Sequence, residues 1–183
     1  MSHSVHAVPF LSRAGWREST VLLAVAALVP FLVHLLPWSG HRPLGVHVLP
    51  VFWTTFVAIY FRGAAMGLAV GLVTPLLSLL LTGLPVSTTI GSMSLEIACF
   101  VPVAALLVAR RPGFWFAAPL AWVAAKGLAI TAQQFIPAFN ETENVGRHLA
   151  RSVQNGLGGL AVLLVINVLL VAFYPKTDEW ERE

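Results

Sequence analysis

Apolar and polar stretches alternate along this chain with a long period. A helix that crosses a membrane needs roughly 20 mostly apolar residues to span the hydrocarbon layer. Six stretches approach that requirement, and they cover residues 20–38, 46–61, 63–81, 93–108, 114–136 and 153–173. The pattern predicts an all-α integral membrane protein with six transmembrane helices in one bundle.

The stretch from Gly45 to Pro85 is the most informative part of this pattern. It holds two of the apolar spans, separated only by Arg62 and Gly63. A connection that short requires a tight hairpin. Polar and helix-breaking residues stand at the ends of this hairpin, where a passive membrane anchor would need none. The stretch therefore indicates a multi-span protein built around a small-molecule site.

Composition supports a lipid environment. The chain has 183 residues, of which 57% are hydrophobic and 10% charged, and its mean hydropathy is +0.81. Soluble domains carry about 25% charged residues, so this chain cannot cover itself with polar surface. The length fits one domain. The basic residues are spread between the spans, which argues against a nucleic-acid partner. Cys99 is the single cysteine, so no internal disulfide is expected.

Charge predicts the orientation. Six spans place both termini on one side, and Lys and Arg favour cytoplasmic loops. With the N-terminus inside, the outer loops hold only Arg42, Arg147 and Arg151, and the other Lys and Arg near span ends are inside. We therefore expect a multi-pass protein of the cell (inner or cytoplasmic) membrane, N-in and C-in, without a cleaved signal peptide. Residues 1–18 form a cytoplasmic segment, 19–175 the transmembrane domain and 176–183 an acidic cytoplasmic tail.

Polar side chains gather at the predicted outer ends of the spans. These residues, with one near the middle of the fifth span, are His47, Glu96, Lys126, Gln133, Gln134, Arg151, Gln154 and Asn155. Ionisable groups within a membrane cost several kcal/mol, so they usually face a cavity or a partner. Glu96 and Lys126 either pair with each other or bind the charged ends of a ligand, and both interpretations stay open. His47 either belongs to a site or faces interfacial water.

Small residues recur every four positions on three spans. The sets are Gly63, Gly67 and Gly71 on the third span, Ala117, Ala121, Ala125 and Ala129 on the fifth, and Thr20 with Ala24, widened by Ala26 and Ala27, on the first. Such stripes let helix backbones approach closely. They serve either packing within the bundle or docking of a partner protein.

Other chemistry is not indicated. The sequence has no Gly-x-Ser-x-Gly, no phosphate-binding loop and no paired-cysteine site. The histidines lack the spacing of metal ligands. No acid, base and nucleophile stand together, so we expect no enzyme activity, no cofactor and no metal.

The hairpin resembles a known family. Its motif runs from His47-Val48-Leu49-Pro50 through Arg62-Gly63 and the glycine-rich third span to Pro75-Leu76-Leu77-Ser78 and Leu81-Thr82-Gly83-Leu84-Pro85. Met93 and Glu96 then match a Met–Glu start of the fourth span, and Asn155-Gly156-Leu157-Gly158-Gly159 matches a glycine-rich sixth span. These motifs resemble the substrate-binding membrane subunit (S component) of energy-coupling factor transporters, which take up vitamins and related micronutrients.

The resemblance implies partners as well as a site. S components capture substrate near the outer face, between the outer loops and spans four to six. They dock on a membrane coupling subunit that joins two ATPase subunits. Small residues on the first span mediate that docking, often as Ala-x-x-x-Ala, and here they would be Thr20, Ala24 and Ala27. This chain departs from the family pattern by having Thr20 at the first of these positions.

We expect the site to bind a small anionic or zwitterionic micronutrient. The ligand set would be His47, Glu96, Lys126, Gln133, Gln134, Arg151 and Asn155. Lys126 and Arg151 would hold a carboxylate or phosphate, and Glu96 an amine or ring N–H. Asn155 and the glutamines would form hydrogen bonds with ring edges. Two alternatives are a standalone facilitator or proton-coupled carrier, and a membrane scaffold that transports nothing.

Overall fold

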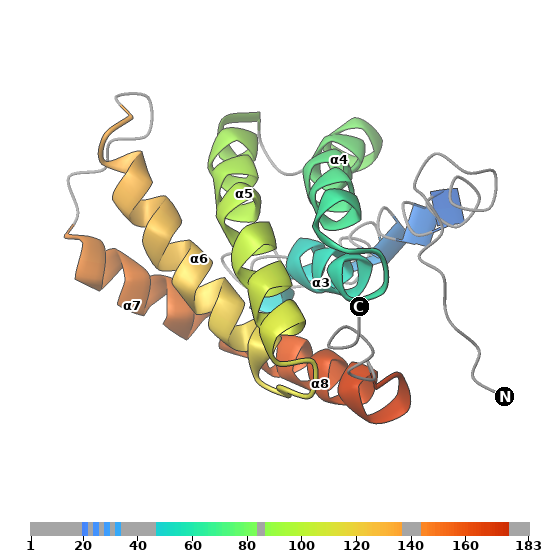
Figure 1. The fold of residues 1–183 in the computed structure, drawn as a ribbon. Helices are drawn as coiled ribbons and strands as arrows, with labels where there is room; N and C mark the ends of the chain where they lie inside the picture. The colour runs from blue at the N-terminus through green and yellow to red at the C-terminus, as the bar shows by residue number, and fades with distance from the viewer. Residues whose placement is uncertain are drawn as a thin grey trace, which may run out of the picture.

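The computed structural model describes residues 20–21, 24–25, 28–29, 32–33, 47–83, 87–136 and 144–175. All regular structure in these ranges is helical, as predicted. The helices with defined bounds are α3 (Pro50–Arg62), α4 (Ala64–Thr82), α5 (Ser87–Arg110), α6 (Ala117–Gln133), α7 (Val145–Asn155) and α8 (Leu157–Phe173). Figure 1 shows α4, α5 and α6 standing next to one another, with α7 and α8 along the bottom of the view.

Two helices are long and apolar enough to cross a membrane, through Ala64–Leu81 in α4 and Thr89–Arg110 in α5. Joined as one bent span, α7 and α8 would be a third. These helices indicate an association with the membrane. The remaining predicted spans and the orientation stay predictions, because α3 and α6 are shorter and only part of the first span lies within the described residues.

The hairpin between α3 and α4 turns at Gly63, as the sequence predicts. Gly63 has a φ of 82°, which glycine adopts without a steric penalty, and its N–H donates to the carbonyl of Ile59 at 2.8 Å. One turn into α4, a Cβ on Gly67 would overlap the side chain of Ile59. A Cβ on Gly71 would lie 2.9 Å from Thr55 Oγ1. Glycine at these positions lets α4 pack closely on α3.

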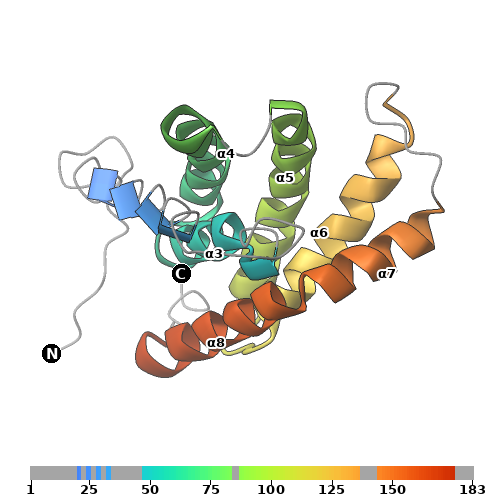
Figure 2. The same cartoon turned by 180° about the vertical axis from the view of Figure 1, so that it is seen from behind.

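Helix α3 lies at the centre of the fold. It contacts α4, α5, α6 and α8, and Figure 2 shows it from behind, between α4 and α5 above and α8 below. Phe56 and Phe100 are completely buried in the core that these helices share, together with Leu163 from α8. Tyr60 donates its hydroxyl to the carbonyl of Tyr174 at 2.7 Å and so ties the end of α3 to the end of α8.

A buried amide on α8 holds the start of α6. Asn167 is 1% exposed, and its Oδ1 accepts from the N–H of Ala118 at 2.7 Å. Its Nδ2 donates to the carbonyl of Phe114 at 3.2 Å. The first N–H groups of a helix have no partner within that helix, and a side chain from a distant helix supplies one here.

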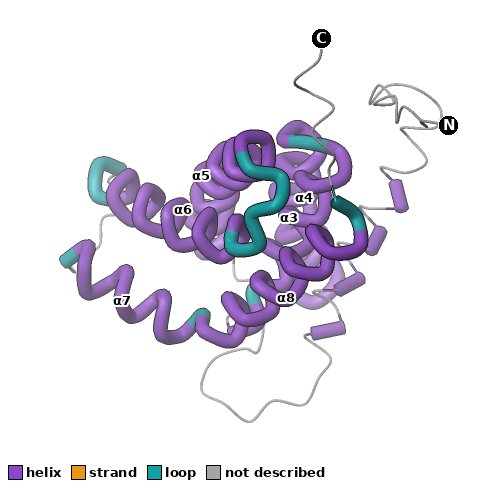
Figure 3. The backbone as a smooth tube through the Cα atoms, turned by 60° about the horizontal axis from the view of Figure 1, so that its bottom comes forward, coloured by secondary structure: helices purple, strands orange, loops and turns teal. Residues whose placement is uncertain are grey.

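The sixth span, predicted as one helix over 153–173, is instead broken at Gly156. Helices α7 and α8 meet there at a bend of 66°, and Figure 3 shows them as two successive helices along one side of the molecule. The break follows the sequence, because α8 is apolar on all sides, whereas α7 repeats apolar and polar residues with helical spacing. The predicted spans did not include residues 145–152, which form the first two turns of α7.

The fifth span also differs from its prediction. Helix α6 begins at Ala117 and ends at Gln133, inside the predicted 114–136. Residues 114–116 form a turn whose carbonyl groups serve as acceptors, including that of Phe114 for Asn167. The fourth span is longer than predicted, since α5 begins at Ser87 instead of Met93. Ser87, Thr88 and Thr89, which make this end of α5 polar, lay outside the predicted span.

Candidate functional site

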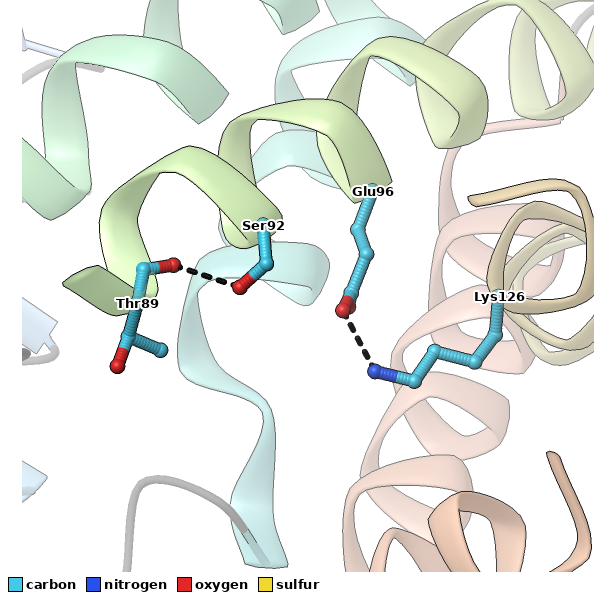
Figure 4. Close-up of polar contacts among 4 residues, drawn as sticks. All are labelled: Thr89, Ser92, Glu96 and Lys126. Carbon is cyan, nitrogen blue, oxygen red and sulfur yellow. Dashed lines mark hydrogen bonds and ion pairs between the residues drawn. The ribbon is translucent and has the colours of Figure 1, made fainter. Parts of the chain in front are cut away.

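Glu96 and Lys126 form an ion pair between α5 and α6. Lys126 Nζ lies 2.6 Å from Glu96 Oε1, and the two side chains are 16% and 13% exposed respectively. Figure 4 shows the two side chains reaching toward each other from neighbouring helices. Of the two interpretations left open by the sequence, the structure therefore shows the pairing. Each charge neutralises the other in surroundings where either alone would be costly.

Polar residues continue along α5 from this ion pair toward the start of the helix. Ser92 precedes Glu96 by four residues and Thr89 precedes it by seven, which places all three on one face of the helix. Ser92 is half-buried and donates to the carbonyl of Thr89 at 2.9 Å, as Figure 4 shows. This polar face leads from the end of α5 that is predicted to face outward down to the ion pair.

Three aromatic rings lie on the other side of the ion pair. Phe100 follows Glu96 by one turn on α5, and Trp122 precedes Lys126 by one turn on α6. Phe52 from the first turn of α3 joins them edge to face, with ring centroids 5.3 Å from Phe100 and 6.3 Å from Trp122. We call these three residues the aromatic cluster. It closes the bundle beneath the charged pair.

The start of α3 packs against the break between α7 and α8, which we call the helix junction (Asn155 to Gly159). His47 Nδ1 lies 3.0 Å from the carbonyl oxygen of Asn155. A Cβ on Gly158 would lie 3.1 Å from the carbonyl oxygen of His47, and one on Gly159 would overlap the side chain of Leu49. The glycines of this segment therefore allow two backbones to meet.

Leu49 is strained at this contact. Its φ of 53° and ψ of 45° place it in the left-handed region, and among the described residues it is the one non-glycine residue with a positive φ. Such a conformation costs roughly 1–2 kcal/mol for a residue with a Cβ. Pro50 begins α3 directly afterwards. Strained residues of this kind persist only where surrounding packing holds them.

Trp122 connects the aromatic cluster to the helix junction. Its ring is 2% exposed, and a Cβ on Gly156 would lie 3.1 Å from its Cη2 and 3.4 Å from its Cζ2. Its Nε1 is buried and has no hydrogen-bond partner among the described residues. The N–H of Trp53, one residue after Phe52, is by contrast bonded to the carbonyl of Val48 at 3.2 Å.

The structure brings the predicted ligand residues together in two pairs. Glu96 meets Lys126, and His47 meets the backbone of Asn155. Gln133 is half-buried at the end of α6, whereas Gln134 is exposed beyond it. Arg151 lies on the exposed face of α7, where Arg147 precedes it by one turn. Gln133 and Gln134 lie at the C-terminal end of α6, whereas Arg151 lies beyond the middle of α7, and none of the three belongs to either pair.

Sequence reasoning did not select Trp122, Leu49 or Ser92. The spacing of four residues between Trp122 and Lys126 was a usable signal, since it puts the indole and the ammonium group on one helix face. The strain at Leu49 had no signal, because leucine almost never adopts this conformation. Ser92 fell outside the predicted span.

The small-residue stripes of the three spans differ in what they contact. Ala117, Ala121, Ala125 and Ala129 are all buried within the bundle. Gly67 and Gly71 contact α3 and α5 side chains. Both stripes therefore serve packing within the chain. Thr20 and Ala24 are helical and exposed, and Ala27 lies outside the described residues.

Comparisons with known proteins give no match. No family model, no curated protein and no solved structure matches this chain significantly. Within the described ranges, no group of three or more His, Cys, Asp and Glu side chains is placed to hold a metal ion.

Proposed function

We propose that this chain is a membrane-embedded capture subunit that binds a vitamin-like micronutrient near the outer face and delivers it through a coupling subunit. S components of energy-coupling factor transporters, whose motifs this chain resembles, have this activity. The chain itself would catalyse no reaction, and two ATPase subunits joined to the coupling subunit would hydrolyse ATP. The support comes from three features of the fold.

The observation that carries the proposal is the broken helix. A helix interrupted at membrane depth leaves backbone groups that lipid cannot satisfy, so such breaks occur where they are packed in protein or line a site. In transporters, interrupted helices commonly form the binding site. Here the 66° break at Gly156 is contacted by the start of α3 and by Trp122 of α6.

The ion pair supplies the second argument. Replacing a buried ion pair by apolar residues is often neutral or stabilising, so such a pair is weak evidence for stability alone. Glu96 and Lys126 would instead exchange partners with a zwitterionic ligand. Its anionic group would bind Lys126, and its amine or ring N–H would bind Glu96.

The polar ends of α5, α6 and α7 supply the third. Ser92 and Thr89 extend the polar face of α5, and Arg147 and Arg151 place two positive charges on the exposed side of α7. Positive charge at the entrance raises the local concentration of an anionic ligand. Arg151, Gln133 and Gln134 would thus meet the ligand at the entrance, before the pair of charges below.

A second candidate function is a membrane scaffold that binds no small molecule. The 2.6 Å contact between Lys126 and Glu96 favours it, since paired charges need no ligand. A standalone carrier that uses the two charges as a proton relay is the remaining alternative.

An uptake assay distinguishes the capture subunit, the scaffold and the standalone carrier. The chain is expressed in a host without any coupling subunit, and in the same host supplied with a complete coupling module, and uptake of labelled vitamins is measured. The proposal predicts uptake only with the module. Uptake without the module would establish a standalone carrier. Absence of uptake in both hosts, for a chain that is folded and inserted, would support the scaffold.

A further inference from the structure

Trp122 carries a buried hydrogen-bond donor that no described part of the chain pairs with. Its ring is 2% exposed, and its Nε1 has no acceptor among the described residues. Nearly all buried polar groups in proteins are hydrogen-bonded, and an unmade bond of this kind costs roughly 1–3 kcal/mol. Trp53 lies in the same region with its N–H bonded to the carbonyl of Val48. Within the described residues, one indole N–H is thus hydrogen-bonded and the other is not.

The unpaired N–H belongs to a ring that packs against the helix junction. Within the indole, Nε1 and Cζ2 are bonded to the same carbon, Cε2, so they belong to one edge. Cζ2 and the neighbouring Cη2 are the ring atoms that would meet a Cβ at Gly156, at 3.4 and 3.1 Å. The indole of Trp122 therefore packs where α7 ends, α8 begins and His47 contacts Asn155.

The same helix face holds a charge one turn away. Lys126 follows Trp122 by four residues on α6, which separates them by roughly 6 Å along the helix axis. Lys126 is paired with Glu96 at 2.6 Å. A ligand bound between these groups would thus meet an ion pair at one end and a single neutral donor at the other.

We propose that the N–H of Trp122 binds an acceptor, a carbonyl oxygen or a ring nitrogen, at the edge of a planar heteroaromatic ligand. An acceptor is required because the indole N–H only donates. A planar ring suits the surroundings, since Phe52 and Phe100 already pack edge to face here. The inference rests on the proposed binding function and identifies the class of substrate for that site.

Helix α7 is the element that would move to admit the ligand. It contains no fully buried residue and joins α8 through Gly156. Displacing it removes less apolar contact than displacing α5 or α6, and segments with few buried contacts open most easily. A Cβ at Gly156 would press on both Trp122 and the carbonyl of Ser152, so glycine keeps this joint close to the indole.

The test removes the indole N–H while keeping a bicyclic aromatic ring of nearly the same shape. A benzothiophene analogue of tryptophan is incorporated at position 122, so that sulfur stands in place of N–H. Binding of riboflavin, folate and pantothenate to the full-length protein in detergent is measured by titration, together with thermal unfolding. Riboflavin and folate carry planar rings with edge acceptors, and pantothenate carries no aromatic ring. Trp115→Phe, at an exposed indole in the turn before α6, is the control.

The inference predicts that riboflavin or folate binds and pantothenate does not. The benzothiophene variant would bind that ligand at least about tenfold more weakly, as expected for one lost hydrogen bond to a buried donor, while its unfolding temperature is unchanged or raised. Trp115→Phe would bind normally. Equal affinity of wild type and benzothiophene variant, or binding of pantothenate alone, overturns the inference and leaves the binding function standing. A folded wild-type protein that binds neither riboflavin nor folate overturns the inference, and the uptake assay described above then decides the binding function separately.

Discussion

At the scale of single residues, substitutions in the ion pair between Glu96 and Lys126 distinguish a structural role from a ligand-binding role. Lys126→Met leaves the carboxylate of Glu96 without a partner in a largely buried position. We expect this change to cost about 3 kcal/mol of stability and to abolish ligand binding. Thermal unfolding in detergent and ligand titration measure the two effects.

The matched control removes both charges. Glu96→Leu combined with Lys126→Leu restores an apolar contact between α5 and α6, so its unfolding temperature should return to near that of the wild type. Under the proposed function the double variant still fails to bind ligand. A double variant that is stable and binds normally would show that the pair has no part in the site.

Asn167 gives a purely structural prediction. Asn167→Leu removes the acceptor for the N–H of Ala118 and the donor to Phe114. Leucine has the same branched heavy-atom skeleton as asparagine but makes no hydrogen bonds, and we expect their loss to cost about 1–2 kcal/mol. Thermal unfolding should show a lower midpoint for this variant than for Val168→Leu at the neighbouring exposed position. Equal midpoints would mean that the amide does not hold the start of α6.

At this scale the sequence singled out Glu96 and Lys126 and offered their pairing as one of two interpretations, but it could not decide between them. Charge inside an apolar stretch identified Glu96 and Lys126, because such residues are costly and therefore rare. Their contact depends on how α5 packs on α6, which no local pattern specifies. Trp122 was missed for the same reason. A tryptophan in an apolar helix is ordinary, and only the tertiary structure shows that its N–H has no acceptor in the described ranges.

At the scale of helices, the close packing of α3 and α4 depends on glycine. Gly67→Ala places a methyl group on Ile59, a β-branched side chain that is 1% exposed and has little freedom to move. We expect this overpacking to cost about 1–3 kcal/mol. The loss is measured as a lower midpoint of thermal unfolding.

Gly127 on α6 is the control for that substitution. A Cβ there would meet only Leu149 Cδ2, at an ordinary distance of 3.9 Å. Gly127→Ala should therefore be neutral or stabilise the helix by up to about 1 kcal/mol. If Gly67→Ala and Gly127→Ala had the same effect, α3 and α4 would not pack as closely as described.

The helix pattern was predictable where apolar residues run continuously and misleading where they do not. The turn at Arg62 and Gly63 lies where the sequence places it, because glycine with a positive φ ends one helix and the next apolar stretch follows at once. Helix α7 was missed because its apolar residues occur at intervals of three and four, the pattern of a helix half-exposed to water. A search for long apolar stretches alone does not detect such a helix.

At the scale of the whole molecule, the orientation can be tested directly. In a Cys99→Ala background, single cysteines are placed at Gly113 and at Gln134, both exposed and at opposite ends of α6. With the N-terminus inside, an impermeant maleimide should label Gln134→Cys in intact cells, and Gly113→Cys only after permeabilisation. The reverse pattern would place the polar ends of α5 and α6 inside the cell.

The arrangement of the molecule accounts for where a ligand would bind. Helix α3 lies at the centre, and its first turn meets α6 and the helix junction beneath the ion pair. The predicted outer ends of α5, α6 and α7 carry the remaining polar residues. A sequence reading could place these residues at one end of the bundle, but the junction that joins them to the core required the structure.

The most direct test of small-molecule capture is native mass spectrometry of the gently purified protein, before and after incubation with a mixture of vitamins, in parallel with the double variant at Glu96 and Lys126. The account predicts one vitamin-sized molecule bound per wild-type chain, released on unfolding, and none on the double variant. A folded wild-type protein that stays empty in the mixture would contradict it.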